Sequence, residues 1–104
     1  MAERARDETP EMRRLRKKID ALDRKIVGLL NERAGIGREV GRAKVAAGRR
    51  TITDRERERE VLLRVSMANQ GPLPQADLLA MYRRLIAATR ALEAADHREG
   101  SDGD

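Results

Sequence analysis

The residues of this sequence that could do chemistry are the few charges that share a helix face with apolar side chains. Charged residues make up 39% of the 104 residues, so a charge run by itself indicates only a solvated surface. When side chains are placed at about 100° per residue along a helix, however, Arg33 and Lys44 fall within about 40° of Ile26, on an apolar stripe. An unpaired charge on a buried face is costly, so each of these cations needs an anion.

The segment TITDREREREV, from Thr51 to Val61, divides by the same criterion. With Val61 as the reference, Asp54, Arg57 and Glu58 lie within about 60° of it, on the apolar side of a helix. The other charges of the run lie at the edge of that side or point away from it: Arg55, Glu56, Arg59 and Glu60. Three charges of the run are therefore expected to face inward.

Two interpretations fit these inward charges. In the first, the two inward acidic residues neutralise the cations in an internal salt-bridge network. In the second, the charges line a pocket for an anionic ligand. The inward cations Arg33, Lys44 and Arg57, with Arg16 on the flank of the stripe, outnumber the inward anions, and this excess favours a ligand with two negative charges.

Composition narrows the functional classes. The sequence has no cysteine and a single histidine, His97 in a polar segment, so a thiolate or histidine metal site is not expected. The net charge of +5 favours anionic partners, but Tyr82 is the one aromatic residue, which leaves no stacking platform for single-stranded nucleic acid. No apolar run approaches the roughly 20 residues of a membrane span, and we expect a cytoplasmic protein.

The elements that must position these charges are helices. No proline occurs from Met12 to about Ala47, and apolar residues recur there at spacings of three and four, which predicts one long amphipathic helix that ends near Gly48. The apolar positions are Met12, Leu15, Ile19, Leu22, Ile26, Leu29, Leu30, Ile36 and Val40.

Two shorter helices are predicted after it. Thr53 and Glu56 have the spacing of a capping box, so the second helix is expected to begin at Thr53 and to run to about Asn69. The third is expected from Gln75 to about Ala95. The sequence thus predicts an all-α domain over residues 10–96, with a long, a short and a medium helix between flexible tails at 1–9 and 97–104.

The length of the first helix indicates a homodimer. About 35 residues form a rod of roughly 50 Å, whereas a compact domain of this size has a radius of gyration of about 13 Å. Such a rod would leave its apolar stripe exposed unless a second copy covered it, so we expect an intertwined dimer. Glycines within the helix are tolerated where helices approach closely or a ligand needs room: Gly28, Gly35, Gly37 and Gly41.

Four segments, in this order, carry a resemblance to a known family: LRKKIDALDRKIVGLLNER (Leu15 to Arg33), EVGRAKVAAG (Glu39 to Gly48), DREREREVL (Asp54 to Leu62) and RRLIAATRALE (Arg83 to Glu93). Together they resemble the all-helical type II chorismate mutases over about residues 11–93. Members of that family rearrange chorismate to prephenate on the route to phenylalanine and tyrosine. The resemblance implies a dianionic substrate and no cofactor or metal.

The resemblance also implies roles for individual residues. Arg33 would hold one substrate carboxylate, and Arg16 would enter the same pocket from the other subunit. Lys44 would contact a carboxylate and the ether oxygen. In the second helix Arg57 would support the carboxylate site, while Asp54, mainly through its backbone, and Glu58 would serve the ring hydroxyl.

Two positions in the third helix complete this set. Thr89 stands where many relatives have serine, a small hydroxyl near a carboxylate. Glu93 stands where many have glutamine, the second donor to the ether oxygen, and an ionised carboxylate cannot donate a hydrogen bond. We therefore expect Glu93 to assist only when protonated.

Several other functions fit the same sequence. A pocket of this kind would also suit an isochorismate-pyruvate lyase or a mutase of 4-amino-4-deoxychorismate. A domain that acts with a partner enzyme of the aromatic pathway is a further alternative. From other classes, a basic helical nucleic-acid-binding module and a bare helical dimerisation module remain.

Overall fold

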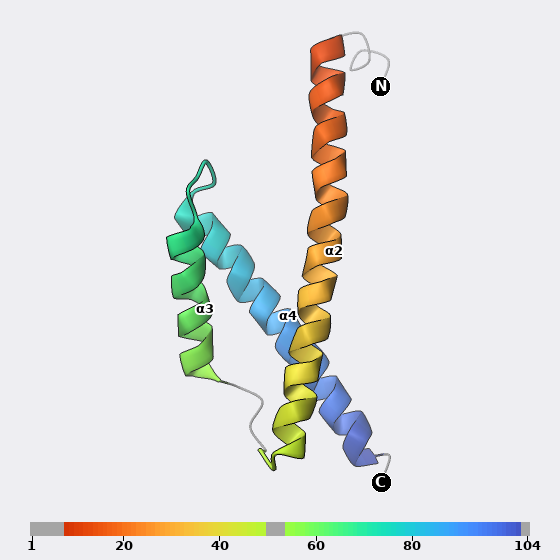
Figure 1. The fold of residues 1–104 in the computed structure, drawn as a ribbon, viewed down its shortest axis with the longest axis vertical. Helices are drawn as coiled ribbons and strands as arrows, with labels where there is room; N and C mark the ends of the chain where they lie inside the picture. The colour runs from red at the N-terminus through yellow and green to blue at the C-terminus, as the bar shows by residue number, and fades with distance from the viewer. Residues whose placement is uncertain (1–7, 50–53, 103–104) are drawn as a thin grey trace. The chain divides into compact units, whose positions relative to one another are not determined.

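The structure is a computed structural model that describes residues 8–49 and 54–102, and it consists of three helices (Figure 1). They are α2 (Pro10–Ala46, 37 residues), α3 (Arg55–Ala68, 14 residues) and α4 (Gln75–Asp102, 28 residues). The predicted all-α class and the order of a long, a short and a medium helix are confirmed. The chain divides into two compact units, residues 1–33 and 34–104, and the boundary falls within α2.

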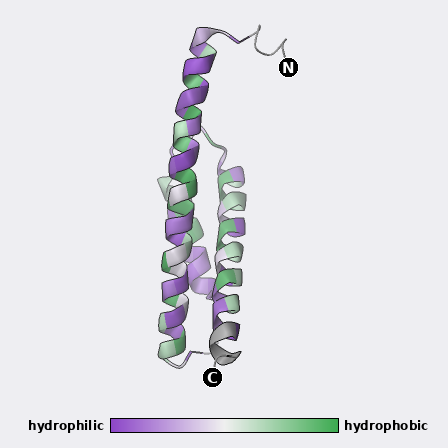
Figure 2. Cartoon of the chain, turned by 90° about the vertical axis from the view of Figure 1, so that its right-hand side faces the viewer, coloured by the Kyte–Doolittle hydropathy of each residue, from purple (hydrophilic) through white to green (hydrophobic). Residues whose placement is uncertain are grey.

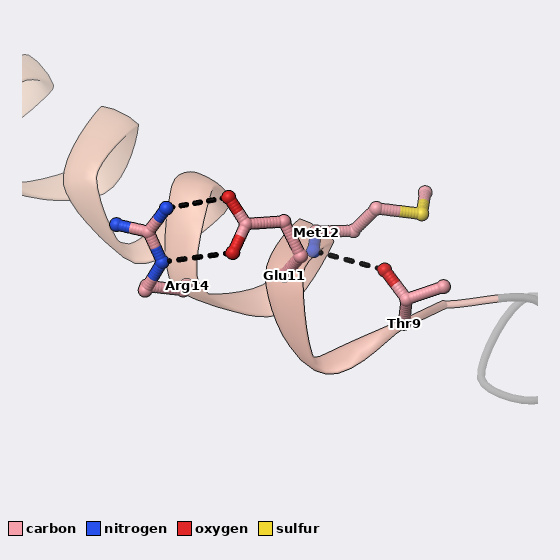
Figure 3. A network of polar contacts seen from close by, with 4 residues as sticks. All are labelled: Thr9, Glu11, Met12 and Arg14. Carbon is pink, nitrogen blue, oxygen red and sulfur yellow. Dashed lines mark hydrogen bonds and ion pairs between the residues drawn. The ribbon is translucent and has the colours of Figure 1, made fainter.

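Helix α2 begins two residues before the predicted start, because its cap lies in front of a proline. The backbone N–H of Met12 donates to Oγ1 of Thr9 at 3.1 Å, and Pro10 occupies the first helical position, where a missing N–H costs nothing (Figure 3). One turn further on, Arg14 donates from Nε to Glu11 at 3.0 Å. These local contacts fix the first turn of the helix.

The predicted end of α2 at Gly48 is confirmed. Gly48 has a φ of 80°, a left-handed conformation that glycine adopts without strain. Its N–H donates to the carbonyl of Val45 at 2.9 Å, and the N–H of Arg49 donates to the carbonyl of Lys44 at 2.9 Å. This pair of bonds is a Schellman motif, and it places Lys44 in the last turn of the helix.

Helix α3 is capped by Asp54, not by Thr53 as predicted. Asp54 has extended backbone angles, and its Oδ1 accepts a hydrogen bond from the N–H of Arg57 at 3.0 Å. Aspartate caps a helix at least as well as threonine, so the cap lies one residue later. Thr53 itself lies outside the described residues. The other end of α3 agrees with the prediction, with Asn69 as its C-cap.

Helix α4 starts at Gln75 as predicted but continues to Asp102, beyond the predicted end near Ala95. No proline interrupts the segment after Ala95, so nothing in the backbone chemistry ends the helix there. The loss of apolar periodicity near His97 therefore does not mark the end of the helix.

In the second unit, α3 and the second part of α2 both contact α4. Helix α3 packs against α4, and the half-buried residues of α3 recur at spacings of three and four: Asp54, Glu58, Val61, Leu62, Val65 and Ser66. The half-buried positions of α2 in this unit are instead small or charged: Ala34, Gly37, Arg38, Gly41 and Lys44.

The apolar residues of α2 remain exposed, and Figure 2 shows green and purple positions recurring along that helix. Ile26, Ile36 and Val40 are 50%, 55% and 47% exposed. Among the described residues no apolar side chain is buried. Within the described part of the chain, α2 therefore contacts α4 mainly through small residues, and the predicted apolar stripe of α2 is not covered. None of the described helices combines the length and the apolar character that crossing a membrane requires.

Candidate active site

Two glycines of α2 allow a close approach to the predicted site residues of α4. A methyl group added at Gly37 would lie 2.4 Å from Cγ2 of Thr89, and one added at Gly41 would lie 3.0 Å from Cγ of Glu93. Gly28 and Gly35 have no such neighbour within 4 Å. Close helix contact, predicted as a reason for the glycines, thus applies to two of the four.

Thr89 is the most enclosed of the predicted site residues. It is only 7% exposed, and its hydroxyl donates to the carbonyl of Leu85 at 3.0 Å. The hydroxyl oxygen retains acceptor capacity, while the methyl group contacts α2 beside Gly37. The residue therefore fixes the spacing between the two helices at this point.

Glu93 lies one turn further along α4, in an environment that disfavours its charge. Burial raises the pKa of the Glu93 carboxyl above its usual value of 4.5 and outweighs the attraction of Lys44 and Arg90, which acts in the opposite direction. A carboxyl with a raised pKa keeps its proton to higher pH and can then donate a hydrogen bond. Lys44 and Glu93 thus bring a cation and a titratable donor to one contact between helices.

Glu58 is half-buried, as its helical phase predicted, but it pairs with a residue that the sequence did not suggest. Its Oε1 lies 3.0 Å from Nη1 of Arg90 on α4. In the salt-bridge interpretation of the sequence, Glu58 and Asp54 would neutralise Arg33 and Lys44. The side chain of Asp54 instead caps α3. Its backbone carbonyl accepts a hydrogen bond from the N–H of Glu58 at 3.0 Å.

Arg57 does not face the interior as predicted. Its side chain is 56% exposed, and its Nη1 lies 3.5 Å from Oε1 of Glu60, on the solvated side of α3. A position about 60° from the centre of an apolar face lies near its edge, where a long side chain can turn toward solvent and pair with a neighbour three residues away.

The two remaining candidates belong to the first unit. Arg16 is exposed and forms an ion pair with Glu8 at 2.5 Å. Arg33 is half-buried and has at least one interaction partner in the protein. Of the eight predicted residues, Thr89 and Glu93 lie at the contact of α4 with α2, and Lys44 on α2 acts electrostatically on Glu93. Glu58 on α3 lies beside Arg90 of α4.

A bidentate ion pair also joins α2 to α4, at a position one turn beyond Glu93 on α4. Arg38 donates from Nε and Nη2 to the two carboxylate oxygens of Asp96, at 2.7 and 2.8 Å. This hydrogen bonding holds the pKa of Asp96 below its usual value of 3.8. The pair fixes the register of α4 against α2 one turn after Glu93.

Arg90 and the pair of Arg38 with Asp96 were not predicted from the sequence. A signal for Arg90 was present, because it lies within about 40° of Ile86 when α4 is placed by helical phase. No comparable signal marks the other pair, which depends on how α2 and α4 are aligned. Within the described part of the chain, no three acidic or histidine side chains are grouped so that they could hold a metal ion.

Comparison with known proteins gives one family. The family profile described as "Chorismate mutase type II" matches residues 15–94. The bifunctional chorismate mutase/prephenate dehydratase of Aquifex aeolicus is 39% identical over 87 residues, which cover 80% of this chain and 24% of that protein. The protein of the same description from Stutzerimonas stutzeri is 34% identical over 90 residues, or 83% of this chain and 25% of that protein. The chain thus spans about a quarter of the length of these relatives.

Solved structures agree with the sequence comparison. The form II structure of chorismate mutase from Thermus thermophilus superposes with a TM-score of 0.77 at 31% identity, over 81% of this chain and 94% of that one. The form I structure of the same enzyme gives a TM-score of 0.72 at 30% identity, over 76% and 98%.

Proposed function

The chain belongs to the type II chorismate mutase family, and from this membership we infer that it rearranges chorismate to prephenate. The observation that carries the inference is the contact of α2 with α4 at which Thr89 and Glu93 pack on glycines and Lys44 attracts a Glu93 with a raised pKa, within the span of the family match. This contact supplies a cation and a hydrogen-bond donor, which are the groups that the reaction uses at its ether oxygen.

The reaction needs few functional groups. A C–O bond breaks while a C–C bond forms within one molecule, so no nucleophile, metal or cofactor takes part. The protein holds the dianion in its compact conformer and stabilises the negative charge that grows on the ether oxygen. Isomerisation by conformer selection and electrostatics accounts for a site built from cations and hydrogen-bond donors.

The proposed site contains the eight predicted residues. Arg33 holds a carboxylate, Arg57 supports the carboxylate site, and Arg16 enters from a second subunit, since planar guanidinium groups bind carboxylates through two parallel hydrogen bonds. Lys44 and protonated Glu93 serve the ether oxygen. The other members act on the ring hydroxyl or line a carboxylate: Asp54, Glu58 and Thr89. In the free protomer Arg57 pairs with Glu60, so substrate binding requires this exposed side chain to exchange partners.

We also propose that the working form is an intertwined homodimer of residues 10–96, flanked by residues 1–9 and 97–104, although α4 itself continues to Asp102. The support is the exposed apolar stripe of α2, in which Leu22 and Ile26 are 55% and 50% exposed, because a second copy would cover it. The lack of cysteine suits a cytoplasmic location. Relatives that carry a prephenate dehydratase in the same chain suggest that a partner enzyme acts next to this domain.

A turnover assay tests the proposal. Purified protein is given chorismate, and both substrate loss and prephenate formation are followed. Arg33→Ala and Lys44→Ala should each lower kcat/KM by at least about 100-fold, because each removes a charge that stabilises the transition state. Lys17→Ala is the matched control, an exposed lysine on the opposite side of α2 from the apolar stripe, and should leave activity unchanged.

Related substrates and binding assays separate the alternatives. Isochorismate and 4-amino-4-deoxychorismate are tested beside chorismate at equal concentration, and a preference for either would reassign the reaction. No turnover by the wild type, or full activity in both alanine variants, would contradict the proposal. Steeply salt-dependent binding of DNA or RNA without turnover would favour the nucleic-acid-binding alternative. Low activity that rises on adding an enzyme of the aromatic pathway would support a partner.

A further inference from the structure

Arg90 and Glu58 form an ion pair between α3 and α4 in which hydrogen bonding is incomplete. Nη1 of Arg90 lies 3.0 Å from Oε1 of Glu58, and their side chains are 37% and 26% exposed. Yet Oε1 of Glu58 and Nε of Arg90 are both buried without a hydrogen-bond partner among the described residues. Attraction therefore holds the two groups together, while each keeps an unused polar atom.

An ion pair of this kind is a poor device for stability. The loss of hydration on burial offsets much of the attraction, and incomplete hydrogen bonding leaves the remaining cost unmet. Packing of α3 on α4 could be achieved more favourably with apolar side chains at both positions. A role in positioning groups for the reaction explains the presence of this ion pair better than a role in stability.

The place of Arg90 on α4 suggests what it positions. It directly follows Thr89 and precedes Glu93 by three residues, so it belongs to the part of α4 that carries two proposed site residues. A site for a dianion that also contains two carboxyl groups, Glu58 and Glu93, must limit their repulsion of the substrate. A guanidinium that pairs with Oε1 of Glu58 removes part of that repulsion and leaves the other carboxylate oxygen, Oε2, as an acceptor.

We propose that Arg90 is a positioning residue of the site: it fixes the Glu58 carboxylate as an acceptor for the substrate's hydroxyl group and offsets its charge toward the dianion. The inference rests on the proposed function. Arg90 does not touch the reacting atoms: it acts mainly through Glu58, with which it pairs, and its attraction for Glu93 is outweighed there by burial. Loss of Arg90 should therefore weaken substrate binding more than it slows turnover of bound substrate.

Variants of the purified protein test this role with chorismate as the substrate. Arg90→Gln should raise KM about tenfold with kcat changed less than about threefold, because an interaction made in both ground state and transition state is lost. Arg90→Lys, which keeps the charge but loses the planar fork, should raise KM about threefold. Arg84→Gln, at an exposed position of the same helix, should leave both constants unchanged.

A double-mutant cycle distinguishes positioning from a separate effect. In a Glu58→Gln background the further change on Arg90→Gln should be less than about twofold, because the group through which Arg90 acts is already altered. An equal tenfold effect in both backgrounds would overturn the proposal, as would a wild-type KM in Arg90→Gln. A lower melting temperature with an unchanged KM would indicate a purely structural pair and overturn it as well.

The outcomes also separate this inference from the proposed function. An inactive wild type would overturn both. An active wild type whose KM is unaffected in the Arg90 variants would overturn this inference alone. If Arg90→Gln does not fold, Arg90→Lys decides, because a threefold higher KM supports the role and an unchanged KM contradicts it.

Discussion

At the scale of single residues, the surroundings of Glu93 would suit a carboxyl group to the donor's task proposed for it. An ionised carboxylate only accepts hydrogen bonds, so in the proposed site it would repel the charge that grows on the ether oxygen. Burial between α2 and α4 raises the pKa of Glu93, and the cations Lys44 and Arg90 lower it by a smaller amount. The balance leaves the neutral, donating form populated to higher pH than in an exposed glutamate.

The pH dependence of Glu93→Gln follows from this balance. Because the pKa of Glu93 lies above 4.5, wild-type kcat/KM should rise as the pH falls and should begin to do so at a higher pH than an ordinary glutamate would allow. Glutamine donates at every pH, so Glu93→Gln should remove this rise and exceed the wild type by at least about tenfold where the pH lies well above the pKa of Glu93. Steady-state kinetics from pH 5 to about pH 9 give both profiles. Parallel profiles would contradict the role of the proton.

Helical phase predicted correctly which helix face Glu58 occupies, but not which residue it pairs with. Helical phase placed Glu58 toward the protein interior, and it is half-buried. Its partner Arg90 could not be predicted, because the pairing of residues on two helices depends on their relative rotation and shift. The prediction that Arg57 faces inward was wrong for another reason, since a long side chain at the edge of a helix face can turn toward the interior or toward solvent.

At the scale of elements, local signals were enough for most helix ends. The glycine after α2 and the start of α4 follow from chemistry within a few residues. The cap of α3 was misplaced by one residue, because Thr53 and Asp54 are both good caps and the sequence does not rank them by context. The contact between α2 and α4 was not predictable from apolar periodicity, since it is formed by glycines, Thr89 and Glu93.

The close approach at Gly37 predicts a specific destabilisation with a rescue. Gly37→Ala would place a methyl group 2.4 Å from Cγ2 of Thr89, and overpacking should lower the free energy of unfolding by about 1–3 kcal/mol despite alanine's better helix propensity. Adding Thr89→Ser removes that methyl group and should recover most of the loss. Gly28→Ala, with no neighbour within 4 Å, should instead gain up to about 1 kcal/mol. Urea denaturation measures all three, and equal effects at the two glycines would contradict the contact.

The ion pair of Arg38 with Asp96 predicts an acid-dependent contribution to stability. Since the pKa of Asp96 is lower in the folded state, the pair stabilises the fold above the usual pKa of 3.8 and loses this effect as the pH falls through the lowered pKa. Asp96→Asn should therefore melt at a lower temperature than the wild type at pH 7, and the two melting temperatures should converge once the pH falls below the lowered pKa of Asp96. Asp20→Asn, at an exposed position of α2, is the control. A difference that persists unchanged in acid would contradict the assignment.

At the scale of the whole molecule, the described part of the protomer has no buried apolar core of the kind that usually stabilises a chain of this size. No described apolar side chain is buried, while Leu22 and Ile26 on α2 remain half exposed. A chain that buries so little apolar surface alone is expected to be stable chiefly as an assembly. Native mass measurement should therefore give twice the mass of 11.7 kDa, and Leu22→Asp together with Ile26→Asp should lower both the mass and the melting temperature.

Complementation between inactive variants tests whether the second copy also completes the site. If Arg16 reaches the pocket of the other subunit, a mixed dimer of Arg16→Ala and Lys44→Ala protomers has one site with both lesions and one with neither. Random pairing in an equal mixture makes half of the dimers mixed, so about one quarter of wild-type activity should return. Arg33→Ala with Lys44→Ala is the matched control, because two residues supplied by the same subunit leave a lesion in every site. Co-expressed, differently tagged protomers give the activity of each mixture. If the first pair recovers no more activity than the control, Arg16 serves the pocket of its own chain, and the dimer stabilises the fold without sharing the site.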